Sequence, residues 1–178
     1  DSPAARQADL LLPLCAGKEQ SVAATKSFIA SLAAAAAVIS NWVEDESLIK
    51  ALHTLPEALH EAANITWPRF ATELVRRDSL YVLGRGPAYP IAHELALKLK
   101  ETCAILAEAY SIAEVMHGPL ELVDNSFTVL ALIPDDAAAH LSRQTLATMK
   151  AAGANVLEIG GPDFPYARTG HMLLDPVS

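Results

Sequence analysis

From about residue 79 onward, short runs of apolar residues alternate with segments of helical character. The apolar runs predict strands at residues 79–83, 128–133 and 155–159, with a fourth at residues 171–174. The stretches between them predict helices at residues 90–104 and 137–152. Strands that are apolar on both faces and alternate with helices indicate a parallel sheet covered on both sides. We therefore expect an open α/β layered domain, with ligands bound beyond the carboxyl ends of its strands.

The part of the chain before residue 67 has a different pattern. Residues 8–14 form an apolar run that predicts a strand, and Gly17 interrupts the chain after it. Residues 19–43 and 47–63 predict two helices, because they are rich in helix-forming residues with helical apolar spacing. The sequence does not begin with methionine and enters almost directly into the strand-like run. We therefore expect it to be an internal piece of a longer protein.

Composition excludes several classes of protein. Hydrophobic residues make up 52% of the chain, enough to bury a core, which excludes a disordered chain. Acidic residues outnumber basic ones by 21 to 13, which argues against a nucleic-acid partner. The most apolar stretch, residues 28–39, is shorter than the roughly 20 residues of a membrane span. Cys15 and Cys103 lie far apart in contexts that predict burial, so we expect no disulfide framework or zinc motif. These features favour a soluble, cytoplasmic protein without a membrane partner.

Three charged residues share one face of the helix predicted at residues 90–104. Glu94, Lys98 and Glu101 follow the spacing i, i+4, i+7. Such a row is most often a solvated ladder of ion pairs. Here, an advance of about 100° per residue places apolar residues beside the row and turns Lys100 toward water. Charges in apolar surroundings are costly unless they pair or serve a site. Both interpretations, an ion ladder and a functional cluster, stay open.

Two further segments could carry chemistry. Residues 84–86 (Gly-Arg-Gly) follow a predicted strand, where a phosphate loop would lie, but Tyr89 replaces the third glycine of a dinucleotide fingerprint. A tight turn explains this segment equally well. His117 ends a short helix that Ser111 and Glu114 would cap. A histidine at a helix C-terminus suits a general acid acting on an oxygen, although a lone histidine is more often structural.

Taken together, these segments resemble the tandem sugar isomerase (SIS) domain family, which includes the isomerase half of glucosamine-6-phosphate synthase and its glutaminase-free relatives. Residues 83–86, 94–101, 107–110 and 114–119 resemble the second SIS domain, and residues 16–26 resemble the end of the first. The resemblance implies a flavodoxin-like parallel sheet with helices on both faces. It also implies a division into the end of a first SIS domain (1–45), a helical connector (46–66) and a second SIS domain, incomplete at its C-terminus (67–178).

The resemblance also implies roles for five residues. Glu101 matches the base that moves a proton between the first two sugar carbons, and Glu94 and Lys98 match groups that hold the substrate and tune that base. His117 matches the ring-opening histidine, which in this family can reach the site of the other subunit. Val22 matches a residue whose backbone contacts the sugar. The implied partners are a phosphorylated hexose or hexosamine and a second subunit in a homodimer with a shared active site, and neither a metal ion nor an organic cofactor is required.

We therefore expect a phosphosugar isomerase of the glucosamine 6-phosphate deaminase/isomerase type, working by ring opening and proton transfer between C1 and C2. Ala24 stands where the synthase pattern commonly has serine, which favours the glutaminase-free relatives. Two alternatives stay open: the isomerase half of a glutamine–fructose-6-phosphate amidotransferase, and a non-catalytic regulator that binds sugar phosphates. The sequence lacks the phosphate loop of the first SIS domain and the synthase's C-terminal lysine, so we expect much of the phosphate anchor to be missing from it.

Overall fold

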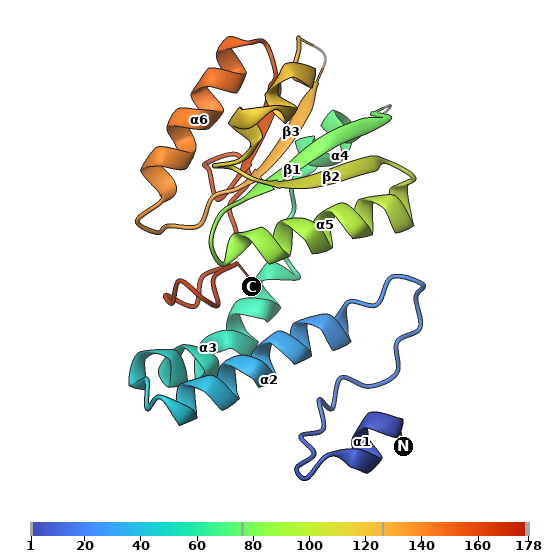
Figure 1. The fold of residues 1–178 in the computed structure, drawn as a ribbon, viewed down its shortest axis with the longest axis vertical. Coiled ribbons are helices and arrows are strands. Elements are labelled where there is room, and N and C mark those ends of the chain that lie inside the picture. The colour runs from blue at the N-terminus through green and yellow to red at the C-terminus, as the bar shows by residue number, and fades with distance from the viewer. Residues whose placement is uncertain (1, 76, 126, 177–178) are drawn as a thin grey trace.

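Four parallel strands form the centre of the molecule. The computed structural model describes residues 2–75, 77–125 and 127–176. The strands are β1 (Ser79–Gly84), β2 (Leu106–Ser111), β3 (Thr128–Leu132) and β4 (Asn155–Ile159). They lie in the order β2-β1-β3-β4, and every neighbouring pair is parallel (Figure 1). The predicted α/β class with a parallel sheet is confirmed.

Helices cover both faces of this sheet. They are α4 (Pro68–Leu74) and α5 (Ala88–Cys103) on one face and α6 (Ala139–Ala151) on the other. Successive side chains of a strand point to opposite faces. Leu80 and Val82 of β1 therefore pack against α5, whereas Tyr81 and Leu83 belong to the core beneath α6. All four side chains are buried, which explains why the strand is apolar without alternation.

Small residues let α5 approach β1 closely. Ala88, Ala92 and Ala96 recur every four residues along one face of α5, and all three are buried. The strand ends at Gly84, where an added Cβ would lie 2.5 Å from the carbonyl oxygen of Ala88. The absence of a side chain at Gly84 thus lets the chain turn directly from β1 into α5.

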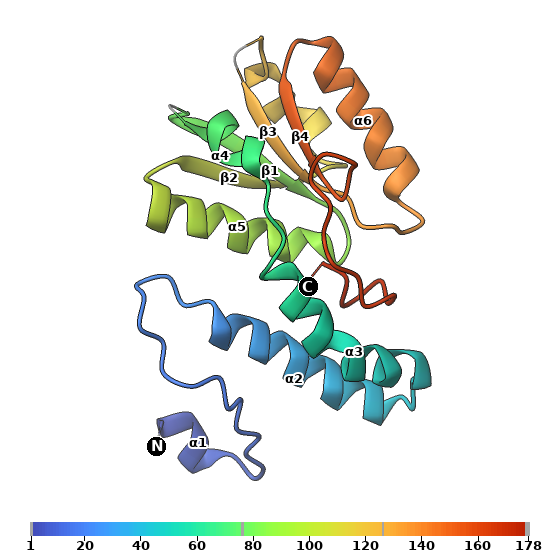
Figure 2. The ribbon, with the colours of Figure 1, turned by 180° about the vertical axis from the view of Figure 1, so that it is seen from behind.

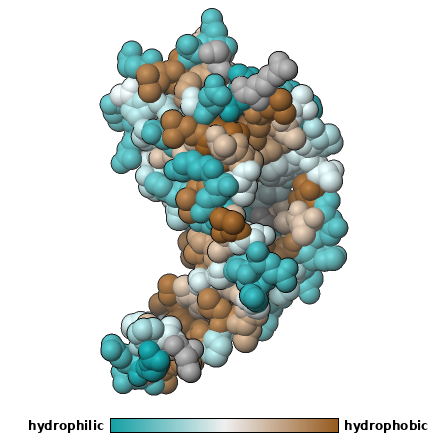
Figure 3. Space-filling view, turned by 90° about the vertical axis from the view of Figure 1, so that its right-hand side faces the viewer, coloured by the Kyte–Doolittle hydropathy of each residue, from teal (hydrophilic) through white to brown (hydrophobic). Residues whose placement is uncertain are grey.

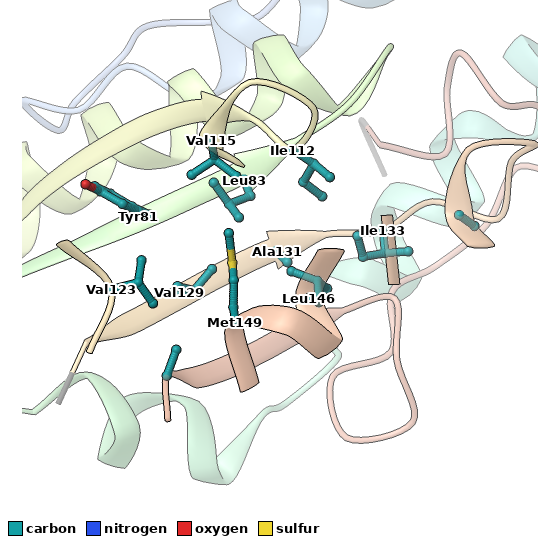
Figure 4. Packing of buried hydrophobic residues seen from close by; sticks show 12 residues of the cluster. Tyr81, Leu83, Ile112, Val115, Val123, Val129, Ala131, Ile133, Leu146 and Met149 are labelled. Atoms are coloured by element: carbon teal, nitrogen blue, oxygen red, sulfur yellow. The ribbon is translucent and has the colours of Figure 1, made fainter. Parts of the chain in front are cut away.

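A large hydrophobic cluster fills the opposite face of the sheet (Figure 4). The side chain of Met149 points from α6 toward the strands, where it meets Val129 and its neighbours. Two short 3-10 helices, η1 (Val115–His117) and η2 (Pro119–Leu122), follow β2. The buried Val115 joins η1 to the same cluster. The segment that carries His117 is therefore anchored to the core of the sheet.

Two long helices form an antiparallel pair beside the sheet: α2 (Lys26–Trp42) and α3 (Glu46–Ala62) (Figures 1 and 2). Leu174, near the C-terminus, packs against Leu48 and Ala51 of α3 and links the pair to the rest of the molecule. A short helix, α1 (Pro3–Gln7), precedes the pair. Figure 3 shows apolar side chains at the surface of the lower part of the molecule, where these N-terminal segments lie.

Two predicted strands are absent from the structure, and one strand of the sheet was not predicted. Residues 8–14 form no strand, because no described segment lies beside them as a hydrogen-bonded partner, and Leu10, Leu11 and Leu12 are exposed. Residues 171–174 form turns rather than a fourth strand. The missed strand is β2, whose alternating polar residues reflect its place at the edge of the sheet. The other three predicted strands are confirmed within one residue at each end.

Two further expectations are corrected. Helix α2 begins at Lys26 rather than at residue 19, because the preceding residues fold into a loop. Cys15 and Cys103 are both exposed, not buried, since Cys15 lies in the extended N-terminal segment and Cys103 ends α5. Within the described parts of the chain, no helix has both the length and the apolar character that crossing a bilayer requires.

Gly84→Ala should lower the free energy of unfolding by about 1–3 kcal/mol, because the new methyl group meets the backbone of α5. Chemical denaturation measures this loss. Gly86→Asn is the matched control: Gly86 has a φ of +55°, which asparagine tolerates, and no atom lies within 4 Å of its added Cβ. A loss for Gly86→Asn as large as that for Gly84→Ala would contradict the close-packing argument.

Thr128→Val should raise the free energy of unfolding by about 1 kcal/mol. Thr128 is fully buried in β3, and its hydroxyl has no hydrogen-bond partner among the residues that the structure describes. Removing an unpaired polar group while keeping the branched shape therefore relieves a desolvation cost. Thermal unfolding compares this variant with Thr148→Val on the exposed side of α6, where we expect little change. A destabilised Thr128→Val protein would show that the hydroxyl is satisfied.

Candidate functional site

The structure brings the three charged residues of α5 together. Nζ of Lys98 lies 3.1 Å from Oε1 of Glu94 and donates a hydrogen bond of 2.9 Å to Oε2 of Glu101. Their side chains are 20% (Glu94), 21% (Lys98) and 30% (Glu101) exposed. We call these three residues the charged row. It is neither a freely solvated ladder nor a buried network, but a half-buried cluster with one open side.

The charged row has an asymmetric charge balance, with two carboxylates sharing one ammonium group. The hydrogen bond to Glu101 raises the pKa of Lys98 above its usual value; desolvation opposes this, and the contact with Glu94 adds to it. Lys98 therefore stays protonated at neutral pH, and its proton holds Glu101 in a fixed orientation. Because water still reaches all three groups, we assign the row little role in stability.

The surroundings of the charged row match the helical periodicity only in part. His93 and Lys100 are exposed, as predicted. Leu97, however, is also exposed, so that flank of the row is open rather than apolar and covered. Glu101 lies in the last turn of α5, before the start of β2. The row thus extends away from the carboxyl ends of the strands, where we expected the site.

His117 lies apart from the charged row within one chain. It ends η1, a single 3-10 turn, and is exposed. The predicted capping box does not form: the hydroxyl of Ser111 accepts a hydrogen bond from the backbone of Ala113, and no side chain caps η1. Glu101 precedes β2 and His117 follows it, and a six-residue strand spans about 17 Å. One chain alone therefore keeps Glu101 and His117 apart, at opposite ends of β2.

Val22 lies in the loop before α2 and is 95% exposed. Sequence reasoning missed Glu19, which organises this loop. Its carboxylate accepts hydrogen bonds from Thr25 and Ser27, and the backbone hydrogen bond from Ser27 is the main cause that lowers the pKa of Glu19 below its usual value. The sequence did offer one signal for this role: an acidic residue stands a few positions before the Thr-Lys-Ser segment at which α2 begins.

A second polar pair lies on β2. The hydroxyl of Tyr110 donates a 2.7 Å hydrogen bond to Oε2 of Glu108, and this bond, with desolvation, raises the pKa of Tyr110 to about 12. The ring of Tyr110 packs edge-on against Tyr81, at 4.9 Å between centroids. Tyr110 therefore remains a neutral hydrogen-bond donor, and Glu108 is held by it.

Two of the hollows among the described residues are large enough to consider, and the charged row lines neither of them. One, of about 340 Å³, lies at the carboxyl ends of β3 and β4 and is lined mainly by apolar and aromatic side chains, including Trp67 and Phe70. The other, of about 770 Å³, lies between residues 12–14, α2 and α3. No group of three His, Cys, Asp or Glu side chains in the described residues could hold a metal ion. In one chain, the half-buried charged row therefore lies outside both of these hollows.

Comparisons with known proteins agree with this architecture. The sequence pattern of the SIS domain matches residues 73–165. The glutamine–fructose-6-phosphate aminotransferase [isomerizing] of Zymomonas mobilis subsp. mobilis is 39% identical over 170 residues, covering 89% of this chain and 28% of the relative. The corresponding aminotransferase of Rhizobium leguminosarum bv. viciae is 36% identical over 172 residues, with the same coverage. This chain therefore spans just over a quarter of the length of these relatives.

Solved structures show the same likeness. A protein of Silicibacter pomeroyi DSS-3 described as a phosphosugar isomerase is 40% identical, with a TM-score of 0.84, over 92% of this chain and 52% of that one. The C-terminal domain of glucosamine-fructose-6-phosphate aminotransferase from Francisella tularensis is 28% identical, with a TM-score of 0.72, over 90% of this chain and 52% of that one. The SIS pattern covers β1 to β4 with the helices between them. The chain therefore belongs to the SIS domain family.

Proposed function

We propose that this protein is a phosphosugar isomerase that converts an aminosugar phosphate of the glucosamine 6-phosphate type into a ketose phosphate and ammonia. The observation that carries the proposal is the charged row, in which Lys98 holds one oxygen of Glu101 and is itself balanced by Glu94. An oriented carboxylate beside a permanent cation suits a base that takes a proton from one carbon and returns it to the next.

Glu101 is the base in this proposal. Its Oε2 accepts the hydrogen bond from Lys98, while Oε1 makes no hydrogen bond among the described residues. Oε1 is therefore the atom that takes the proton from C2 of the opened sugar and delivers it to C1. Lys98 and Glu94 bind the substrate's polar groups at the same face of α5. A fixed carboxylate lowers the entropic cost of reaching the reactive geometry.

His117 and Val22 complete the proposed site from outside the charged row. Opening the sugar ring needs an acid at the ring oxygen and a base at the anomeric hydroxyl, and an imidazole can serve as either. Since β2 separates His117 from Glu101 in one chain, we propose that the histidine comes from the second subunit of a homodimer. The backbone at Val22, in an exposed loop, is available for hydrogen bonds to the sugar.

The proposed reaction balances without a redox partner. After ring opening, Glu101 moves the C2 proton to C1 and one proton of the amine passes to O1, so the C1=O bond becomes a C–OH bond, the C2–N bond becomes C2=N, and the amino aldehyde becomes a hydroxymethyl ketimine. Water then adds to the imine carbon, and ammonia leaves, so that the ketone forms. Ala24, in place of the serine common in the synthase pattern, favours this direction.

A second candidate runs the amine transfer in the opposite direction, as the isomerase half of a glutamine–fructose-6-phosphate amidotransferase. The names of the curated relatives favour it.

The test is to incubate the full natural protein with glucosamine 6-phosphate and measure ammonia and fructose 6-phosphate. Glucosamine 6-phosphate formed only from fructose 6-phosphate and glutamine would instead support the second candidate. Calorimetric binding without turnover of either substrate would indicate a regulator.

Glu101→Gln should lower kcat by about 10²–10⁴-fold, because the amide cannot accept the proton. The measurement is ammonia release, with circular dichroism to check folding. Glu57→Gln is the matched control, since Glu57 is exposed on α3 and the chemical change is the same. Full turnover by Glu101→Gln would remove Glu101 as the base.

Mixing two inactive variants should restore activity if the site is shared. Glu101→Gln and His117→Ala, co-expressed in equal amounts, should regain about a quarter of wild-type turnover, because about half of the dimers are mixed and each mixed dimer keeps one intact site. Each variant expressed alone is the control. Co-expressed variants no more active than the parents would contradict the shared site.

A further inference from the structure

We infer that Glu19 is a positioning residue that closes the loop before α2 and so fixes the backbone at Val22. The inference rests on the proposed function, because it takes Val22 as a residue that meets the sugar. Oε1 of Glu19 holds the two ends of the loop together. It accepts hydrogen bonds from the backbone N–H of Thr25 at 3.1 Å, and from the backbone N–H and the hydroxyl of Ser27 at 2.8 and 2.9 Å.

A second bond closes the loop at the same place. Nζ of Lys26 donates a 2.7 Å hydrogen bond to the carbonyl oxygen of Lys18. Between these closing bonds, Ala23 is buried, whereas its neighbour Val22 is almost fully exposed. The loop is thus closed at its base and fixed at one internal residue, and it presents Val22 at its tip.

The helix start explains why the closing residue must come from upstream. Thr25, at the N-cap position of α2, makes no capping hydrogen bond with its own side chain. The first backbone N–H groups of a helix need an acceptor from elsewhere. Glu19 supplies that acceptor from six residues before Thr25, so the same hydrogen bonds cap the helix and close the loop.

The start of α3 offers an internal comparison. Oδ1 of Asp45 accepts hydrogen bonds from the N–H of Ser47 at 3.0 Å, its hydroxyl at 2.7 Å, and the N–H of Leu48 at 3.1 Å. The number and type of donors match those around Glu19. The difference is that Asp45 is adjacent to its helix and encloses no loop. Asp45 is therefore a cap alone, whereas Glu19 is a cap that also shapes a loop.

This difference sets the expected effect on catalysis. Without Glu19 the loop samples many backbone conformations, and each substrate molecule must order it on binding. An interaction made equally in the ground state and the transition state changes KM and leaves kcat unchanged. Glu19→Ala should therefore raise KM for the sugar phosphate by roughly tenfold at nearly constant kcat.

The test is steady-state kinetics of the full natural protein with glucosamine 6-phosphate, comparing Glu19→Ala, Glu19→Gln and Asp45→Ala. The amide oxygen of Glu19→Gln can accept the same hydrogen bonds more weakly, so KM should return most of the way to the wild-type value. Asp45→Ala should lower the melting temperature about as much as Glu19→Ala but leave KM unchanged. An unchanged KM in Glu19→Ala, or an equal rise in Asp45→Ala, overturns the inference.

Hydrogen exchange separates failure of this inference from failure of the proposed function. In Glu19→Ala, the amides of Thr25 and Ser27 should lose protection, and in Asp45→Ala they should keep it. If the wild-type protein turns over no sugar phosphate while this exchange pattern holds, the proposed function fails and the loop-closing role of Glu19 stands. If the two amides keep their protection in Glu19→Ala, the loop-closing role itself is wrong.

Discussion

The close packing of α5 on β1 is the constraint on which the rest of the structure depends. Gly84 and the alanines at 88, 92 and 96 allow this contact, and they fix which face of α5 turns inward. Once that face is buried, the charged row must lie at the edge of the contact, half-exposed. The position of the proposed base is therefore a consequence of how the alanine-lined face of α5 packs against β1.

Much of this arrangement follows from local sequence patterns. Uninterrupted apolar runs predict strands buried on both faces, and helical spacing correctly groups Glu94 with Lys98 and Glu101. The edge strand β2 was not predicted, because an edge position tolerates polar residues and the segment is therefore not a continuous apolar run. Residues 8–14 are such an apolar run, but they have no partner strand, and a sequence pattern alone cannot show whether a partner is present.

The candidate site was less predictable than the fold. Glu19 reaches across six residues to a helix start, and periodicity carries no information about such a bond. Likewise, Ser111 and Glu114 have the spacing of a capping box, but the chain follows a single 3-10 turn that offers no place for one. The separation of His117 from Glu101 depends on where β2 lies, which only the assembled sheet reveals.

The sharing of Lys98 between two acids has a consequence for the charge of the row in the proposed reaction. In the resting state the charged row sums to one negative charge, and a carboxylate that has accepted a proton brings that sum to zero. Lys98 then still has Glu94 as its counter-ion. In the proposed reaction the ammonium of Lys98 therefore always keeps a carboxylate beside it, and no compensating ion needs to enter or leave when Glu101 takes up or gives back a proton.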